Sequence, residues 1–223
     1  MQAMPERAAD PHAGQPVLSA GVPIEEASGA LILIHGRGAS AQDILPLARE
    51  IGADHLACLA PQAANHTWYP FSFLMPLQQN EPFLSSALSR VSALVDQVIA
   101  AGVPAERIVL AGFSQGSCLV SEFAARYARR YGGLVVFSGG LIGPEGTPRQ
   151  YDGSLDGTPV FIGCSNVDAH IPEARVLETG DVLQQLGGIV DLRIYPGMGH
   201  TINRDEIEAA RAIVDQIAVR SDG

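Results

Sequence analysis

Short apolar runs alternate with segments of helical period along this 223-residue chain, and this alternation constrains its fold more than any other feature. The run Ala30–Ile34 is continuously apolar, as expected of a strand buried on both faces. Comparable runs predict strands at 55–59, 108–111, 134–137, 160–162 and 189–195. The intervening segments predict helices at 40–51, 82–101, 118–131, 172–186 and 204–219. Together they predict an α/β protein with a doubly wound, mainly parallel sheet flanked by helices.

The domain organisation follows from length and from the start of the chain. Residues 28–220 suit a single domain, because α/β folds of this size are often undivided. Residues 1–27 hold several prolines and charges but no apolar run, which argues against a signal peptide. We expect this leader either to be mobile or to cap a sheet edge. No stretch reaches the roughly 18 apolar residues of a membrane span.

The charged residues exclude several functions. The chain has 24 acidic and 14 basic residues, a net charge of −10, and every basic residue is arginine. The absence of lysine excludes a Schiff-base lysine, a Ser–Lys dyad and a phosphate-binding P-loop lysine. The acidic balance argues against nucleic acids and anionic membranes as partners.

The three cysteines, Cys58, Cys118 and Cys164, are odd in number and have no metal-like spacing. This pattern predicts no metal site and fits reduced thiols in a cytoplasmic protein. Since at least two lie in apolar strand or helix patterns, we expect buried packing rather than reactivity.

The strongest chemical motif is Gly112-Phe113-Ser114-Gln115-Gly116, a G-x-S-x-G sequence between a predicted strand and a predicted helix. A sharp turn there would force Ser114 into a strained backbone conformation and expose its hydroxyl above the sheet. Glycines on either side leave room for the neighbouring backbone. An ordinary glycine-rich turn is the alternative, but the strand–turn–helix context favours a nucleophile.

A serine nucleophile needs a base that is oriented by an acid, and both have candidates in the chain order Ser, Asp, His. Asp168 follows the predicted strand at 160–162, and His200 follows the strand at 189–195. Both therefore lie at carboxyl ends of strands, where open parallel sheets place their sites. With no lysine in the chain, histidine is the main candidate for the base.

Other acids and histidines have less suitable positions. His12 lies in the leader and His55 at a strand start, whereas His35 ends the first strand but precedes the serine, so we expect it to shape the adjacent loop. The less suitable acids are Asp152, Asp156 and Asp191, in a loop or inside a strand.

An oxyanion hole requires two backbone donors. The amide of Gln115 directly follows the serine, and the amide of Arg37 lies in the glycine-rich loop after the first strand. The Arg37 guanidinium has two open interpretations: it contacts an anionic substrate group, or it has a surface or structural role.

Aromatic residues gather in the segment 62–81, which has no regular period and is predicted to be a long loop. Trp68, Tyr69, Phe71 and Phe73 either wall a substrate pocket or pack under the loop. His170, two residues after Asp168, is a candidate for a substrate contact at the pocket rim.

The segments LILIHGRGAS, APQAANHTWYP, GFSQG, GCSNVDAHIP and YPGMGHTIN resemble the phospholipase/carboxylesterase family of α/β-hydrolases, which includes acyl-protein thioesterases. The resemblance covers about residues 28–220 and is nearest to small bacterial carboxylesterases. It implies a serine hydrolase without metal or cofactor, monomeric or homodimeric, that acts on short or medium acyl esters and sometimes thioesters. It assigns catalysis to Ser114, Asp168 and His200, and oxyanion binding to Arg37 and Gln115.

The function expected from these observations is serine carboxylesterase activity through an acyl-enzyme intermediate. Acyl thioesterase or lysophospholipase activity is an alternative within the family, although His35-Gly36-Arg37-Gly38-Ala39 and Ser117 depart from the thioesterase pattern. A non-catalytic binding module on the hydrolase fold is the alternative from another class. Ester and amide hydrolysis are not distinguished, because the same three residues serve both.

Overall fold

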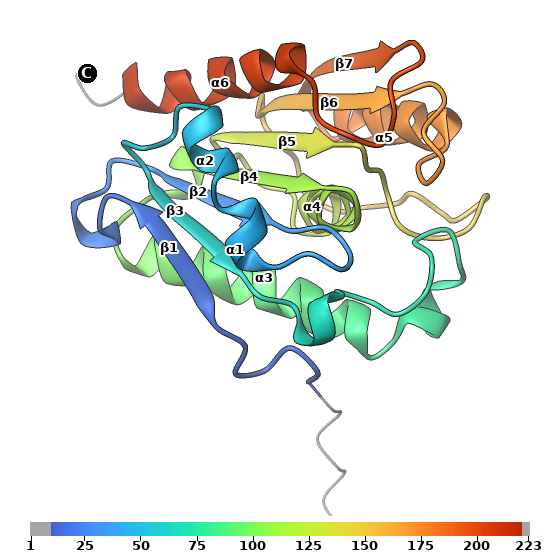
Figure 1. The fold of residues 1–223 in the computed structure, drawn as a ribbon, viewed down its shortest axis with the longest axis horizontal. Helices are drawn as coiled ribbons and strands as arrows, with labels where there is room; N and C mark the ends of the chain where they lie inside the picture. Colours follow the sequence, from blue (N-terminus) through green and yellow to red (C-terminus); the bar gives the residue numbers. More distant parts are fainter. Residues whose placement is uncertain (1–9, 220–223) are drawn as a thin grey trace, which may run out of the picture.

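A seven-stranded sheet organises the chain, and the computed structural model describes residues 10–219 (Figure 1). The strands are β1 (Val17–Gly21), β2 (Ala30–Ile34), β3 (Ala57–Pro61), β4 (Ile108–Phe113), β5 (Gly133–Phe137), β6 (Pro159–Ser165) and β7 (Ile189–Tyr195). Their order in the sheet is β1-β3-β2-β4-β5-β6-β7, and all except β1 run parallel to their neighbours. The predicted α/β class and mainly parallel sheet are confirmed.

The chain direction across the sheet places a site between β2 and β4. From β2 the chain moves outward to β3, then crosses back to β4 and continues outward through β5, β6 and β7. Open α/β sheets hold ligands in the crevice at the carboxyl ends of the strands where this direction reverses. The loops after β2 and β4 lie at that point.

Helices cover both faces of the sheet (Figure 1). They are α1 (Ala41–Ile44), α2 (Leu47–Glu50), α3 (Phe83–Ala100), α4 (Gln115–Arg126), α5 (Glu173–Gln185) and α6 (Arg204–Val219). One hydrophobic core lies between the sheet and α3, α4 and α5, and a second lies between the sheet and α1, α2 and α6. This arrangement is the doubly wound architecture that the alternation predicts.

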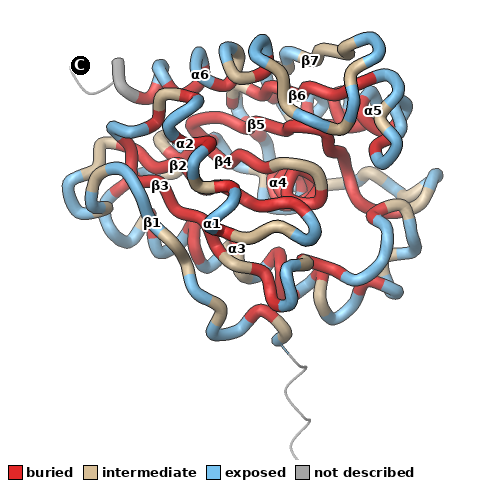
Figure 2. Tube along the Cα trace, in the orientation of Figure 1, coloured by how far each residue is buried: buried red, intermediate tan, exposed pale blue. Residues whose placement is uncertain are grey.

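The central strands read as continuous apolar runs because both of their faces are buried. In β2, Ile32 belongs to one core, while Leu31 and Leu33 belong to the other. Figure 2 shows the buried residues along the middle of the sheet and α4, with exposed residues on the outer turns of the peripheral helices.

The prediction of six strands is wrong by one, because residues 17–21 form β1. This strand pairs antiparallel with β3, with Leu18 opposite Ala60. None of its five residues is fully buried, so it has no apolar run to reveal it. Part of the predicted leader 1–27 thus caps the sheet edge, whereas residues 1–9 lie outside the described residues, as do 220–223.

The single helix predicted at 40–51 is also wrong, because α1 and α2 are separate short helices. Pro46 lacks an amide hydrogen and cannot continue the helical hydrogen-bond ladder. The predicted start is confirmed: Ser40 and Asp43 form a capping box in which each side chain accepts from the other's backbone amide. Gly52, at a φ of 78°, ends the segment as predicted.

Helix α3 is long and apolar enough to meet the length and composition criteria for a membrane span, and among the described residues it alone does so. No such segment was expected from the sequence. Its apolar side faces the protein core, where Leu84, Leu88, Val91 and Val95 are buried. A core helix of a soluble domain passes the same two criteria, and this burial accounts for the apolar composition of α3.

Candidate active site

The turn between β4 and α4 has the strained geometry expected of the serine motif. Ser114 adopts a φ of 56° and a ψ of −119°, a region that non-glycine residues rarely occupy. Phe113 ends β4 and Gln115 begins α4, so the turn contains one residue. The Ser114 hydroxyl therefore stands above the carboxyl edge of the sheet, at the positive end of a 12-residue helix.

The two glycines of the motif are required because backbone atoms approach them closely. A Cβ atom on Gly112 would lie 2.6 Å from the carbonyl carbon of Gly116. A Cβ atom on Gly116 would lie 2.0 Å from the carbonyl oxygen of Ile34 in β2. Neither neighbour is a movable side chain, so the expectation that these glycines admit the neighbouring backbone is confirmed.

We expect Gly116→Ala to destabilise the protein by about 3 kcal/mol or more, because the methyl group must displace the backbone of β2. For a domain of this size the loss corresponds to a fall in melting temperature of roughly 6–12 °C. Gly199→Ala is the matched control, since nothing lies within 4 Å of its Cβ position. Similar melting temperatures for the two variants would contradict the close approach.

The three residues predicted to act together are in contact. The Ser114 Oγ lies 2.8 Å from His200 Nε2, and His200 Nδ1 lies 2.7 Å from Asp168 Oδ2. The carboxyl ends of β4, β6 and β7 bring them to one edge of the sheet although 86 positions separate Ser114 from His200. The rings of Phe113 and His170 lie against the imidazole, with centroids 4.9 and 4.8 Å away.

Asp168 is held as a carboxylate. Its second oxygen, Oδ1, accepts hydrogen bonds from the backbone amides of His170 at 2.8 Å and Ile171 at 3.1 Å. Burial of the carboxyl group opposes ionisation, but the hydrogen bonds from His200 and from these amides outweigh it and lower the pKa of Asp168. The ionised form can fix the tautomer and orientation of the His200 ring.

Two asparagines anchor the loop that carries His200. Asn166 accepts a hydrogen bond from the Gly197 amide at 2.9 Å, which ties this loop to the one that carries Asp168. At the start of α6, Asn203 and Glu206 each accept a hydrogen bond from the other's backbone amide. The Glu206 side chain is fully buried and its Oε1 atom has no partner among the described residues. Burial raises the pKa of this carboxyl to about 7.

Because the pKa of Glu206 is raised in the folded state, its contribution favours folding below pH 4.5 and is lost as pH rises through about 7. We expect Glu206→Gln to remove this dependence. Between pH 5 and pH 8, urea unfolding should show a decline about 2–3 kcal/mol larger for the wild type than for the variant. Glu208→Gln, at an exposed position of α6, is the control. An equal decline in the wild type and Glu206→Gln would contradict the assignment.

The two predicted oxyanion donors have free backbone amides. Among the described residues, neither the Arg37 nor the Gln115 amide donates a hydrogen bond within the protein. The loop that carries Arg37 is held by His66, whose carbonyl accepts from the Gly38 amide and whose Nδ1 lies 2.9 Å from the Ala39 carbonyl. Sequence reasoning did not consider His66, which has no local pattern.

His35, at the end of β2, has the loop-shaping role that its position predicts. The ring is fully buried, with Nδ1 2.8 Å from the Gly36 carbonyl oxygen and Nε2 accepting from the Ala63 amide at 3.1 Å. Burial lowers its pKa, so the neutral imidazole joins the loop after β2 to the loop after β3.

The side chains of Arg37 and Gln115 hold the aromatic loop, a role that sequence reasoning missed for Gln115. The Arg37 guanidinium donates to the carbonyls of Pro70 at 2.7 Å and Phe71 at 2.6 Å. The Gln115 amide accepts from the Trp68 backbone amide and donates to the Tyr69 carbonyl, both at 2.9 Å. The loop therefore has a fixed position relative to Ser114.

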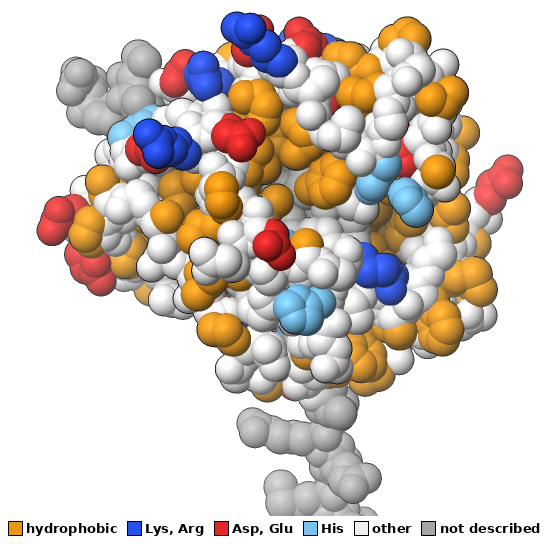
Figure 3. Space-filling model, in the orientation of Figure 1, with side chains coloured by type: hydrophobic (Ala, Val, Ile, Leu, Met, Phe, Trp, Pro, Cys, Tyr) orange, Lys and Arg blue, Asp and Glu red, His pale blue; other side chains and the backbone are white. Residues whose placement is uncertain are grey.

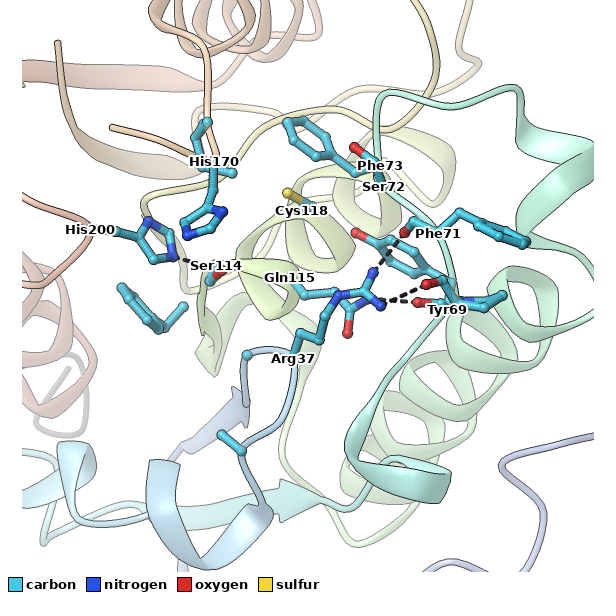
Figure 4. A pocket seen from close by; sticks show the side chains of 15 residues that line it. Arg37, Tyr69, Phe71, Ser72, Phe73, Ser114, Gln115, Cys118, His170 and His200 are labelled. Carbon is cyan, nitrogen blue, oxygen red and sulfur yellow. Dashed lines mark hydrogen bonds between the residues drawn. The ribbon is translucent and has the colours of Figure 1, made fainter. Parts of the chain in front are cut away.

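A cavity of about 500 Å³ opens beside Ser114 (Figure 4). In the space-filling view, basic and histidine side chains border a hollow on this face of the molecule (Figure 3). The cavity is lined by Gly36, Arg37, Ala39, Tyr69, Pro70, Phe71, Ser72, Phe73, Phe113, Ser114, Gln115, Cys118, His170, Ile171 and His200. Its volume is in the range of small-molecule sites, and its lining is largely apolar.

The predicted substrate-contacting residues divide into two groups. Tyr69, Phe71, Phe73 and His170 line the cavity. Trp68 does not: its ring is fully buried in the core and its indole nitrogen donates to the His35 carbonyl at 2.8 Å. Trp68 therefore packs in the core under the loop, which was the alternative stated for these aromatic residues.

The N-terminal segment also contacts the aromatic loop, through the side chain of His12. His12 is fully buried, its Nε2 lies 2.9 Å from the Trp68 carbonyl oxygen, and its Nδ1 accepts from the Ala64 amide at 3.1 Å. Burial lowers the pKa of His12. Sequence reasoning set His12 aside as part of the leader, and that reading missed this structural role.

The cysteines are free and buried, as expected. Cys118 lines the cavity, but burial raises the pKa of its thiol to about 12, which keeps it protonated and poorly nucleophilic. Within residues 10–219, no group of histidine, cysteine or acidic side chains is arranged to hold a metal ion.

A serine hydroxyl that is hydrogen-bonded to an imidazole can be activated as a nucleophile by general-base catalysis, when the imidazole is in turn hydrogen-bonded to a buried carboxylate. Two unpaired amides beside it can stabilise an oxyanion. The sheet order and the strand–turn–helix geometry together define an α/β-hydrolase fold, with Ser114 in the turn between β4 and α4.

The comparisons with known proteins place the chain more closely. The model of the phospholipase/carboxylesterase family matches residues 18–217, so this chain belongs to that family. A crystal structure of a phospholipase/carboxylesterase from Dyadobacter fermentans is similar, with 43% identity, a TM-score of 0.87 and coverage of 95% of this chain and 100% of that one.

Curated relatives match at lower identity and over shorter stretches. A probable SOBER1-like carboxylesterase of Arabidopsis thaliana is 30% identical over 58% of this chain and 50% of its own length. Acyl-protein thioesterase 1 of Debaryomyces hansenii is 27% identical over 67% of this chain and 65% of its own length. The chain thus spans about half the length of the plant relative.

Proposed function

We propose that this protein is a serine carboxylesterase that hydrolyses short- to medium-chain carboxylic esters. The observation that carries the proposal is the continuous contact from Ser114 through His200 to Asp168, at 2.8 and 2.7 Å, at the wall of an apolar cavity. The names of the family and of its plant relative point in the same direction.

The proposed reaction has two halves. His200 takes the proton of Ser114 as the serine oxygen attacks the ester carbonyl, and the amides of Arg37 and Gln115 stabilise the oxyanion. His200 then protonates the leaving alcohol. Water repeats the sequence on the acyl-enzyme, while Asp168 holds the imidazole throughout.

The size of the cavity is consistent with the proposed short- to medium-chain acyl group. Tyr69, Phe71 and Phe73 present aromatic surface to it, and its volume of about 500 Å³ accommodates a small substrate without a cofactor. We propose that the protein acts in the cytoplasm, as a monomer or homodimer, on a small-molecule ester, without a nucleic-acid or membrane partner. The three free, buried cysteines fit a reducing compartment.

A series of p-nitrophenyl esters from acetate to dodecanoate tests the proposal. We expect kcat/KM to peak at short or medium acyl length and a fluorophosphonate probe to label one site, Ser114. Absence of turnover together with absence of labelling would instead favour the non-catalytic binding module.

Thioesterase activity is the second candidate, favoured by the similarity to an acyl-protein thioesterase. Palmitoyl-CoA and a lysophospholipid, assayed beside the preferred p-nitrophenyl ester, distinguish it and the lysophospholipase alternative. A higher kcat/KM on either substrate would replace the carboxylesterase assignment.

A further inference from the structure

The charge of the cavity differs from that of the whole chain. The protein has a net charge of −10, yet no aspartate or glutamate is among the residues that line the cavity. Asp168, the acid that contacts His200, has a fully buried side chain directed at the imidazole. Arg37 is the cavity's permanent cation, and the positive end of α4 lies beside it.

The Arg37 guanidinium is fixed in place but keeps hydrogen-bonding capacity. Its contacts with the Pro70 and Phe71 carbonyls use one N–H of each terminal nitrogen. The guanidinium carbon, Cζ, lies 5.9 Å from the centroid of the Tyr69 ring. A guanidinium has five N–H donors, so three remain. No carboxylate in the described part of the chain forms an ion pair with Arg37.

The position of Arg37 relative to Ser114 indicates which half of an ester it faces. In Figure 4, His200 and His170 lie on one side of Ser114, and Arg37 lies on the other, beside Tyr69 and Phe71. The leaving alcohol departs on the side of His200, which must protonate it. The acyl group therefore extends toward Arg37.

From this geometry we propose that the substrates are half-esters of short dicarboxylic acids, whose free carboxylate binds the Arg37 guanidinium. This inference rests on the proposed esterase function and names its substrate class. In the reaction, the bond between the acyl carbon and the alkoxy oxygen breaks, the oxygen of water joins the acyl carbon, and a dicarboxylate, an alcohol and one proton are released. A carboxylate and a guanidinium form a strong charge-assisted hydrogen bond, worth about tenfold or more in binding.

The test compares two esters of one shape that differ in charge: monoethyl glutarate and the ethyl ester of glutaramic acid, with ethanol release as the readout. We expect wild-type kcat/KM to favour the anionic ester by about tenfold or more, mainly through KM. Arg37→Gln should bring the ratio close to one, and Arg37→Lys should retain part of it. Salt at 0.5 M should reduce the wild-type ratio but not that of Arg37→Gln.

The ratio is kcat/KM on the anionic ester divided by kcat/KM on the neutral ester. Because both values are measured with the same protein, a general loss of activity in a variant does not affect it. Arg49→Gln removes the same charge at an exposed position of α2, outside the cavity lining, and should leave the ratio as in the wild type. A wild-type ratio of one or less, or a ratio that Arg37→Gln leaves unchanged, would overturn the inference. If the neutral ester alone is hydrolysed in a Ser114-dependent manner, the half-ester inference fails and the proposed esterase function stands. If neither ester nor any p-nitrophenyl ester is hydrolysed, both fail.

Discussion

Replacement of Ser114 by alanine should lower kcat/KM on the best ester about 10⁴- to 10⁶-fold while the protein remains folded. The hydroxyl is the atom that we propose to attack the substrate, and its contact with His200 at 2.8 Å would be lost. The backbone strain at a φ of 56° stays, since alanine and serine share the same Cβ constraint. Steady-state kinetics and a thermal melt measure the two effects.

Fluorophosphonate labelling provides the control for this prediction, because the cavity also contains the Cys118 thiol. Label should attach to the wild type and be absent from Ser114→Ala. Burial raises the pKa of Cys118 to about 12, so it should not substitute as nucleophile. Label that persists in Ser114→Ala, or turnover close to that of the wild type, would refute the nucleophile assignment.

Asp168→Asn should reduce kcat by about 10⁴-fold with little change in fold. The asparagine oxygen can still accept the His170 and Ile171 amides, as Oδ1 of Asp168 does. Its NH₂ group would then face His200 Nδ1 and donate to it. The ring proton would move to Nε2, which could no longer accept the proton of Ser114.

Asp181→Asn, on the exposed side of α5, is the matched control for this substitution. Burst kinetics with a p-nitrophenyl ester report acylation directly, and the burst should disappear in Asp168→Asn only. A loss of less than about tenfold would mean that the orientation of His200 is set by the loop anchors at Asn166 and Asn203 instead.

Much of the fold could be predicted because the central parallel strands are buried on both faces. Strands β2 and β5 are continuous apolar runs, and α6 has the predicted bounds of Arg204–Val219. The residues of the candidate site were found for a related reason. Each follows a recognisable strand, and carboxyl ends of parallel strands lie at one edge of the sheet. Strand β1 escaped prediction because it is largely exposed and so has no buried apolar run, and it lies at the sheet edge, antiparallel to β3.

The support of the site could not be predicted, because it depends on side chains that bond to distant backbone. Arg37 binds the carbonyl of Pro70, 33 positions away, and Gln115 binds the amide of Trp68, 47 positions away. Asn80, fully buried, accepts from the Phe71 amide and donates to the Ser72 carbonyl. Such contacts leave no periodic pattern, so the sequence did not separate Trp68, a core residue, from Tyr69 in the cavity wall.

The contact of His12 with Trp68 and Ala64 has a consequence for how substrate range can change in this protein. The family match begins at residue 18, so His12 lies outside the part of the chain that the family model describes. Yet its ring supports the loop that carries Tyr69 and Phe71 into the cavity. Substitutions in this N-terminal segment can therefore change the shape of the cavity while Ser114, Asp168 and His200 stay unchanged.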